Sequence, residues 1–182
     1  MKAVFLDRDG VINRYPGNKK YVTSWKQFRF LPHALEALAL LRANGFKVFV
    51  ISNQAGVSKG LYSQKALDFL SANMLKEVRK AGGDISEVYY CTHLPEEGCS
   101  CRKPRPGLIR AAKKKYRLNL EKVFFVGDSI LDVLTARAAG IKSILVMSGR
   151  ERLSNKKKWE AKPDFVLGNI FEAALFITHL KK

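Results

Sequence analysis

Two aspartates separated by one residue follow the first apolar run of the chain. The run Val4 to Leu6 leads into Asp7 and Asp9, and Gly10 comes directly after them. One carboxylate placed in this way can attack phosphorus, while a second within reach exchanges the proton of the leaving group. Aspartates also end strands simply because they form turns, so the pair alone leaves both interpretations open.

Polar residues that suit phosphoryl transfer occur at three further places. They are Ser52, Asn53 and Gln54 after one predicted strand, Lys103 in a loop before a helix, and Asp128 after another strand. A phosphate dianion requires hydrogen-bond donors, a fixed cation, and a divalent metal that screens it from an attacking carboxylate. Ser52 can donate, Lys103 supplies the cation, and Asp128 with Asp7 offers the oxygen ligands that Mg²⁺ prefers.

Asp132, four residues after Asp128, has two interpretations. In the segment GDSILD, Ser129 can cap a helix, with Asp132 as the acidic third residue of a capping box. Asp132 can also orient the residues that bind the metal without binding the metal itself. The two roles are compatible, so the sequence leaves both open.

All three cysteines of the chain fall within one short segment, CTHLPEEGCSC. The candidate metal ligands of this segment are Cys91, His93, Cys99 and Cys101. A disulfide is disfavoured by the odd number of thiols in a chain expected to be cytosolic. We therefore predict a structural Zn²⁺ in a zinc loop, 91–101, because four protein ligands leave no open position. The last ligand lies two residues before Lys103, so the metal would also hold Lys103 and Arg102.

The length and composition favour one globular domain. The 182 residues, 47% of them hydrophobic, predict a single domain spanning 1–182. No apolar stretch is long enough to cross a bilayer, and the opening MKAVFLDRDG does not resemble a signal peptide. We therefore expect a monomeric cytoplasmic protein without a membrane partner.

The formal net charge of +17 indicates anionic partners. Basic clusters lie at Lys113 to Lys115, at Lys156 to Lys158 and at the two C-terminal lysines. Such an excess attracts phosphorylated metabolites or nucleic acid, or it forms a solvated surface. No aromatic RNA-binding motif and no zinc finger with helix-borne histidines accompanies it. Charge therefore leaves the partner open.

Short apolar runs alternate with longer amphipathic ones along the chain. This pattern predicts an α/β, Rossmann-like, doubly wound and mainly parallel sheet with helices on both faces. The predicted strands are 3–6, 47–51, 87–90, 122–126, 142–146 and 164–167. The predicted helices are 32–43, a helix capped by Ser63, 106–116, 130–139 and 170–180, with a lysine-rich surface loop at 154–158. Ligands of such sheets bind beyond the carboxyl ends of the strands, where the polar residues are expected.

The segments FLDRDGVI, ISNQ, RKPRPG and VGDSILD match, in this order, the four motifs of the haloacid dehalogenase-like phosphohydrolases. The resemblance covers essentially the whole chain. It implies that Asp7 is the nucleophile that forms an aspartyl-phosphate, and that Asp9 protonates the leaving oxygen and then activates water. It further implies that Ser52 binds phosphate, with Asn53 and Gln54 beside it.

The same resemblance implies the cofactors and the charges of the site. Lys103 would neutralise the nucleophile and the phosphate. Mg²⁺ would be held by Asp7, by Asp128 and by the backbone carbonyl of Asp9. The segment between Ser52 and Lys103 is too short for a large cap domain, so selectivity would come from the short loops 14–26 and 54–61 and from the zinc loop.

The zinc loop resembles that of the histidinol-phosphatase subfamily, which includes the D-glycero-D-manno-heptose 1,7-bisphosphate 7-phosphatases. The segments SNQAGVSKG and CRKPRPG look more like the heptose enzymes, and Arg102 and Arg105 would clamp the phosphate that stays behind. The short zinc loop, and GDS in place of GDK, look closer to histidinol phosphatases. We therefore expect a sugar bisphosphate as substrate, with histidinol phosphate as the alternative.

A nucleic-acid substrate is an alternative from another class. The same four motifs occur in polynucleotide 3'-phosphatases, and a chain of charge +17 could bind nucleic acid ends. We see no aromatic-rich basic channel and no added binding module, so a small phosphorylated metabolite is the favoured partner.

Overall fold

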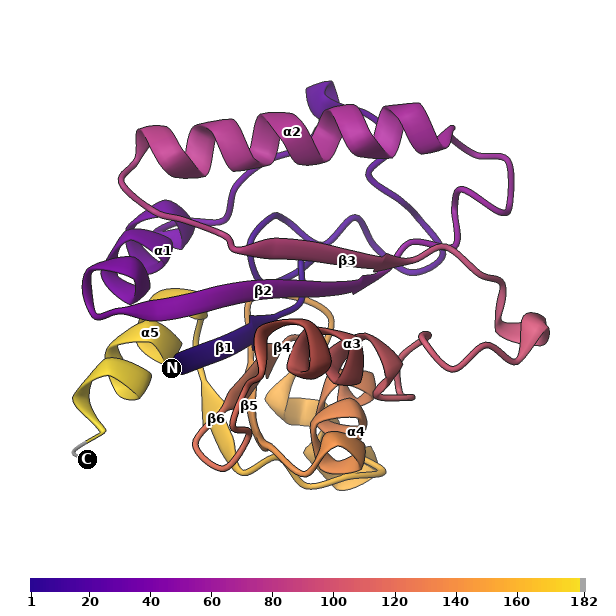
Figure 1. Cartoon of the computed structure of the whole chain (residues 1–182). Coiled ribbons are helices and arrows are strands. Elements are labelled where there is room, and N and C mark those ends of the chain that lie inside the picture. The colour runs from indigo at the N-terminus through magenta and orange to yellow at the C-terminus, as the bar shows by residue number, and fades with distance from the viewer. Residues whose placement is uncertain (181–182) are drawn as a thin grey trace.

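The computed structural model describes residues 1–180, so the C-terminal lysine pair of the basic clusters lies outside the described residues. A six-stranded sheet with the order β3-β2-β1-β4-β5-β6 forms the centre of the molecule (Figure 1). All neighbouring strands are parallel. The strands are β1 (Lys2–Leu6), β2 (Phe46–Asn53), β3 (Glu87–Cys91), β4 (Phe124–Gly127), β5 (Lys142–Val146) and β6 (Phe165–Leu167).

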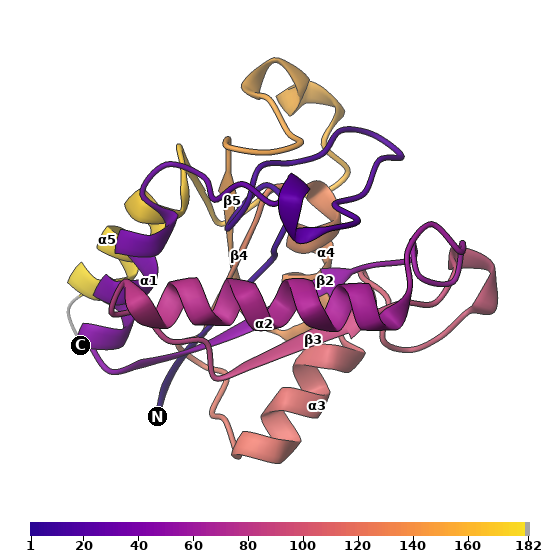
Figure 2. The same ribbon diagram turned by 90° about the horizontal axis from the view of Figure 1, so that it is seen from above.

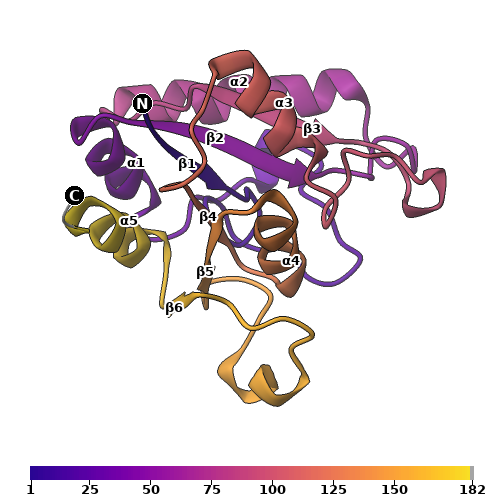
Figure 3. The same cartoon turned by 60° about the horizontal axis from the view of Figure 1, so that its bottom comes forward.

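Within the described residues, five α-helices cover both faces of this sheet. They are α1 (Ala34–Ala43), α2 (Gln64–Lys80), α3 (Gly107–Tyr116), α4 (Ile130–Ala139) and α5 (Ile170–His179). The buried side chains of α1, α2 and α5 share one hydrophobic cluster with one face of the strands, whereas α3 and α4 pack on the other face. Figures 2 and 3 show these two helical layers from above and from below. The predicted doubly wound α/β fold is confirmed.

The strands form because their runs are apolar on both faces, as buried parallel strands require. Val4, Phe5 and Leu6 of β1 are fully buried, and they pair with Val48, Phe49 and Val50 of β2. The strand β2 continues to Asn53, so Ser52 and Asn53 end this strand rather than follow it. Hydrogen bonding to β3 extends β2 to this point.

The start of α1 and the conformation of residues 153–158 also differ from the sequence prediction. The helix α1 begins at Ala34 rather than in the turn of Pro32, because His33 has a left-handed backbone and ends the preceding turn. Residues 153–158 form an exposed 3₁₀ helix where a loop is predicted. Ser63 caps α2 as predicted, and its side chain accepts a hydrogen bond from the Ala66 amide at 3.1 Å.

The order of the strands places the carboxyl end of β1 between those of β2 and β4. The chain winds in opposite directions from β1, and an open sheet of this kind forms a ligand crevice at such a reversal. The segments after β1 and β2 are short loops and turns, without a large cap domain among the described residues. None of the described helices is both long and apolar enough to span a bilayer.

Candidate active site

Lys103 lies at the centre of a buried charge cluster. Its Nζ atom is 2.9 Å from Asp7 Oδ2 and 2.6 Å from Asp132 Oδ1, and it donates to the Ile51 carbonyl at 3.2 Å. The three contacts use all three donors of the ammonium group. Burial disfavours the charged lysine, but the two carboxylates outweigh it and raise the pKa of Lys103 above its ordinary value. Lys103 is therefore a fixed cation beside the predicted nucleophile.

Asn53 holds the backbone of this lysine. The Asn53 amide group donates to the Lys103 carbonyl at 3.2 Å and accepts from the Lys103 amide at 3.1 Å. The loop before α3 is thereby fixed to the end of β2, across 50 positions of sequence. This pairing explains how a side chain from a loop enters the site in one orientation.

Asp128 occupies a cradle formed by two glycines. A Cβ atom on Gly10 or on Gly149 would overlap the Asp128 carboxylate, and Gly10 also has a φ of +88° that favours glycine. The Arg150 amide donates to Asp128 Oδ2 at 2.7 Å. These contacts fix the carboxylate at the carboxyl end of β4, beside that of β1.

Three carboxylates and one lysine meet at this point, so the cluster carries an excess of negative charge. Oxygen atoms of Asp7, Asp128 and Asp132 lie within 4.8 Å of one another. Burial raises the pKa of Asp7 to about 6 and that of Asp128 well above its ordinary value, although Lys103 opposes both shifts. A divalent cation would therefore complete the charge balance at neutral pH.

The oxygens of Asp132 are already engaged by protein donors. Oδ1 contacts Lys103, and Oδ2 accepts hydrogen bonds from the Ser129 amide at 3.1 Å and from the Ser129 hydroxyl at 2.6 Å. The capping box of α4 is thus present, together with an ion pair to Lys103 that sequence spacing does not reveal. Asp7 and Asp128 are the better candidates for direct metal contact, and hard carboxylate oxygens suit Mg²⁺.

A cavity of about 180 Å³ opens above these carboxylates. Among the predicted site residues, Asp7, Asp9, Ser52, Asn53, Arg102, Lys103 and Asp128 line it. Gln54 does not, because it is fully buried behind Asp9 and its oxygen accepts from the Tyr62 hydroxyl at 2.7 Å. Arg105 does not either, because its guanidinium group donates to the Cys99 carbonyl on the zinc loop.

Several cavity residues escaped individual prediction. Tyr15, Lys19, Lys20 and Tyr21 come from the loop after β1, and Arg150 comes from the turn after β5. The loop 14–26 was predicted to contribute to selectivity, but no motif marked these individual side chains. Arg150 could have been suspected only from its place just after a strand.

The cysteines and the histidine of the zinc loop form a second cluster. Cys101 Sγ lies 3.3 Å from Cys91 Sγ, 3.4 Å from Cys99 Sγ and 3.2 Å from His93 Nδ1. Ligands at ordinary Zn–S and Zn–N distances in a tetrahedron are about 3.5–3.8 Å apart, which is close to these separations. The three thiols are not joined by disulfides. The cluster can therefore hold a zinc ion.

Both arginines of the RKPRPG segment donate to the zinc loop, and Arg102 also lines the cavity. Arg102 lines the cavity while its Nη1 atom donates to the His93 carbonyl at 3.2 Å, and Arg105 donates to Cys99. The backbone N–H of Gln54 also donates to the Cys91 carbonyl at 2.7 Å. The zinc loop and the cavity thus share one wall.

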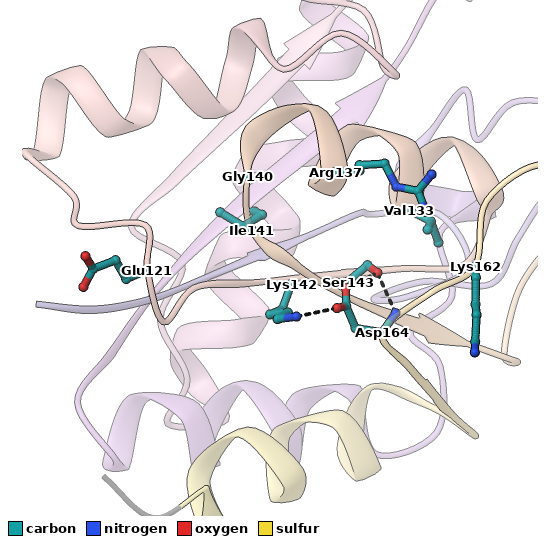
Figure 4. A pocket seen from close by; sticks show the side chains of 9 residues that line it. All are labelled: Glu121, Val133, Arg137, Gly140, Ile141, Lys142, Ser143, Lys162 and Asp164. Atoms are coloured by element: carbon teal, nitrogen blue, oxygen red, sulfur yellow. Dashed lines mark hydrogen bonds and ion pairs between the residues drawn. The ribbon is translucent and has the colours of Figure 1, made fainter.

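A separate cavity of about 320 Å³ lies at the opposite ends of the strands, beside the start of β5 (Figure 4). Its main polar groups satisfy one another. Lys142 Nζ donates to Asp164 Oδ1 at 2.8 Å, and Ser143 donates to the other oxygen of Asp164 through its amide and its hydroxyl, both at 2.9 Å. This arrangement joins β5 to the turn before β6, and we assign it no chemistry.

Comparison with known proteins identifies the family. The HAD-hydrolase-like family model matches residues 100–173. The D-glycero-beta-D-manno-heptose-1,7-bisphosphate 7-phosphatase of Pseudomonas putida is 39% identical over 150 residues, covering 82% of this chain and 85% of that protein. The corresponding alpha-heptose phosphatase of Photorhabdus laumondii is 34% identical over 157 residues, covering 82% and 84%. The chain therefore belongs to the haloacid dehalogenase-like hydrolases.

A solved structure agrees with this assignment. The D,D-heptose 1,7-bisphosphate phosphatase from B. bronchiseptica, complexed with magnesium and phosphate, superimposes with a TM-score of 0.91 at 32% identity. The match covers 97% of this chain and 98% of that structure. The comparison therefore extends over nearly the whole chain.

Proposed function

We propose that this chain is a Mg²⁺-dependent phosphomonoesterase that removes the 7-phosphate of a D-glycero-D-manno-heptose 1,7-bisphosphate. The observation that carries the proposal is the cluster of Asp7, Lys103 and Asp128 at the point where the sheet reverses its winding. Relatives with this activity in their names support the choice of substrate.

In this proposal an Asp7 oxygen attacks the phosphorus of the 7-phosphate and the sugar oxygen leaves. Lys103 holds Asp7 in place and offsets the charge of the phosphate, while Ser52 donates a hydrogen bond to it. Asp9 gives a proton to the leaving oxygen and later takes one from the water that attacks the aspartyl-phosphate. Asp7, Asp128 and the Asp9 carbonyl would hold Mg²⁺, which would supply positive charge to offset that of the phosphate and the carboxylates.

The rim of the cavity supports a substrate with a second anionic group. Lys19, Lys20, Arg102 and Arg150 all line it, in addition to the buried Lys103. None of these four makes an ion pair with a carboxylate of the described residues. Guanidinium groups bind phosphate through paired hydrogen bonds, so Arg102 and Arg150 are our candidates for contact with the 1-phosphate. Arg105 is instead proposed to brace the zinc loop.

We further propose that this chain is a monomeric cytoplasmic enzyme that holds a structural zinc ion. Unpaired cysteines are the usual state in a reducing compartment, which is where such a thiolate site persists. Four protein ligands would leave the zinc no open position, so the ion would stabilise the wall that carries Arg102 rather than take part in chemistry.

The substrate is tested by comparing kcat/KM for four compounds in the presence of Mg²⁺. These are both anomers of the heptose bisphosphate, L-histidinol phosphate and a 3'-phosphorylated oligonucleotide. We expect at least one anomer to exceed the other two classes by a hundredfold, about 2.7 kcal/mol of transition-state discrimination. Preferred hydrolysis of histidinol phosphate, or of the oligonucleotide with steep salt dependence, would overturn the sugar bisphosphate.

Replacement of Cys99 by serine tests the role of the zinc loop. We expect loss of zinc, a lower thermal midpoint and a lower kcat/KM, because the wall bearing Arg102 is no longer fixed. Metal content is measured by atomic emission on the purified protein. Ser100→Ala, in the same loop but outside the cluster, is the matched control and should retain zinc. Unchanged zinc and unchanged kinetics in Cys99→Ser would refute the assignment.

A further inference from the structure

Arg8 stands between the two aspartates, and its side chain is fully buried. Its guanidinium group grips the Asp9 carboxylate in a bidentate manner. Nε and Nη2 donate to Asp9 Oδ1 at 3.1 and 3.0 Å, and Nη2 donates to Oδ2 at 2.9 Å. Of the two neighbouring aspartates, the Arg8 side chain therefore contacts Asp9 and not Asp7.

Two more buried residues complete a cage around Asp9. The side-chain amide of Asn13 donates to Asp9 Oδ1 at 2.8 Å, and the side-chain amide of Gln54 donates to Asp9 Oδ2 at 2.9 Å. Both side chains are fully buried, and Gln54 is itself fixed by Tyr62 and lies 3.2 Å from the Ser52 hydroxyl. Every contact in this set is a donor directed at an oxygen of the Asp9 carboxyl group, so the cage fixes the orientation of that group.

Burying the Arg8 guanidinium group costs folding free energy, which indicates that Arg8 is there for its contact with Asp9 rather than to stabilise the core. Its remaining nitrogen, Nη1, is buried without a hydrogen-bond partner, and an unpaired buried donor costs about 1–3 kcal/mol. Buried ion pairs are often no more stabilising than apolar residues of similar size. The ion pair with Asp9, at 2.9 Å, is the contact that compensates the charge of this buried guanidinium group. We therefore infer that the role of Arg8 is to fix the orientation of the Asp9 carboxyl group.

We propose that Arg8 is a positioning residue that, with Asn13 and Gln54, holds the Asp9 carboxylate at the edge of the cavity for proton transfer. The Asp9 side chain is 18% exposed, so one edge faces the cavity while the cage holds the rest. The inference rests on the proposed function, because it acts through the proton that Asp9 exchanges with the leaving oxygen and with water.

Leaving-group dependence distinguishes positioning from a structural role. An alkyl phosphate, such as the sugar 7-phosphate, needs a proton on its leaving oxygen, whereas p-nitrophenolate leaves without one. The kcat/KM value reports the steps up to formation of the aspartyl-phosphate, so it isolates the acid role of Asp9. We expect Arg8→Lys, which keeps the charge but loses the bidentate grip, to lower kcat/KM for the alkyl ester about tenfold or more. The aryl ester should lose less than about threefold.

The same variant is measured in an Asp9→Asn background. Without Asp9 to position, Arg8→Lys should cause no further loss on the alkyl ester, because residues that act as a unit are not additive. Arg29→Lys, an exposed arginine outside the site, is the control and should match the wild type on both esters. Equal losses on both esters, or a further loss in the Asp9→Asn background, would show that Arg8 is only structural and overturn the proposal.

Asn13→Ala is the second variant, for the case in which Arg8→Lys does not fold. It removes one cage donor, and we expect the same selective loss on the alkyl ester to a smaller degree. Wild-type ratios of the two esters in folded Arg8→Lys and Asn13→Ala would also overturn the proposal. The proposed function fails separately, if the wild-type protein hydrolyses neither ester or if Asp9→Asn leaves alkyl ester hydrolysis unchanged.

Discussion

Replacement of Asp7 by asparagine is expected to abolish turnover and, in the metal-free protein, to stabilise the fold. Loss of the nucleophile should lower kcat by roughly 10⁴-fold or more. Burial raises the pKa of Asp7 to about 6, so above that pH the ionised carboxylate costs free energy in the folded state. Asparagine removes that cost without changing shape. Steady-state kinetics and thermal unfolding in buffer without added Mg²⁺ measure the two effects.

In Asp7→Asn, turnover is expected to fall while the stability of the metal-free protein rises, and this combination distinguishes a nucleophile from a structural aspartate. A merely structural aspartate would lose activity and stability together. Asp68→Asn, on the exposed surface of α2, is the matched control and should change neither quantity. Residual wild-type rates in Asp7→Asn would refute the assignment of the nucleophile, and a lowered thermal midpoint at pH 7 would refute the charge argument.

Replacement of Lys103 by methionine should damage both activity and stability. The substitution keeps the length of the side chain but leaves Asp7 and Asp132 without their shared cation. Breaking a buried charge cluster by removing one partner costs about 3–5 kcal/mol of folding free energy. We also expect kcat/KM to fall roughly 10³-fold, because a preorganised cation beside the phosphate is lost. Denaturant unfolding and phosphate release measure the two losses.

Lys115→Met is the control for this variant, since Lys115 pairs with Glu87 at 2.7 Å on the surface of the protein. Exposed ion pairs contribute little, so this change should leave kinetics unaltered and stability close to the wild type. A Lys103→Met protein that retains wild-type kcat/KM would contradict the proposed role of Lys103 beside the nucleophile.

The sequence predicted the sheet well because parallel strands buried on both faces leave a strong apolar signal. It also predicted which strand ends carry Asp7, Ser52 and Asp128, since in a doubly wound sheet those ends meet. The metal cluster of the zinc loop was visible because its four ligands are close together in the chain. These are local patterns, and local patterns can be seen without coordinates.

Pairs between distant segments were not visible in the same way. The ion pair of Asp132 with Lys103 joins residues 29 positions apart, whereas the capping box of Asp132 is a local signal. Gln54 follows a strand end as a site residue would, yet Tyr62 and Asp9 draw it behind the cavity. Arg105 donates to the Cys99 carbonyl, a contact that its spacing from Arg102 does not indicate.

Phosphorus NMR shows which of the two phosphates of the heptose bisphosphate the enzyme removes. Wild-type protein, with Mg²⁺ present, is mixed with D-glycero-D-manno-heptose 1,7-bisphosphate, and the two ester resonances are followed over time. We expect the 7-phosphate resonance to be replaced by that of inorganic phosphate while the 1-phosphate resonance persists. Loss of the 1-phosphate first, or two unchanged esters with folded, metal-loaded protein, would contradict the proposed function.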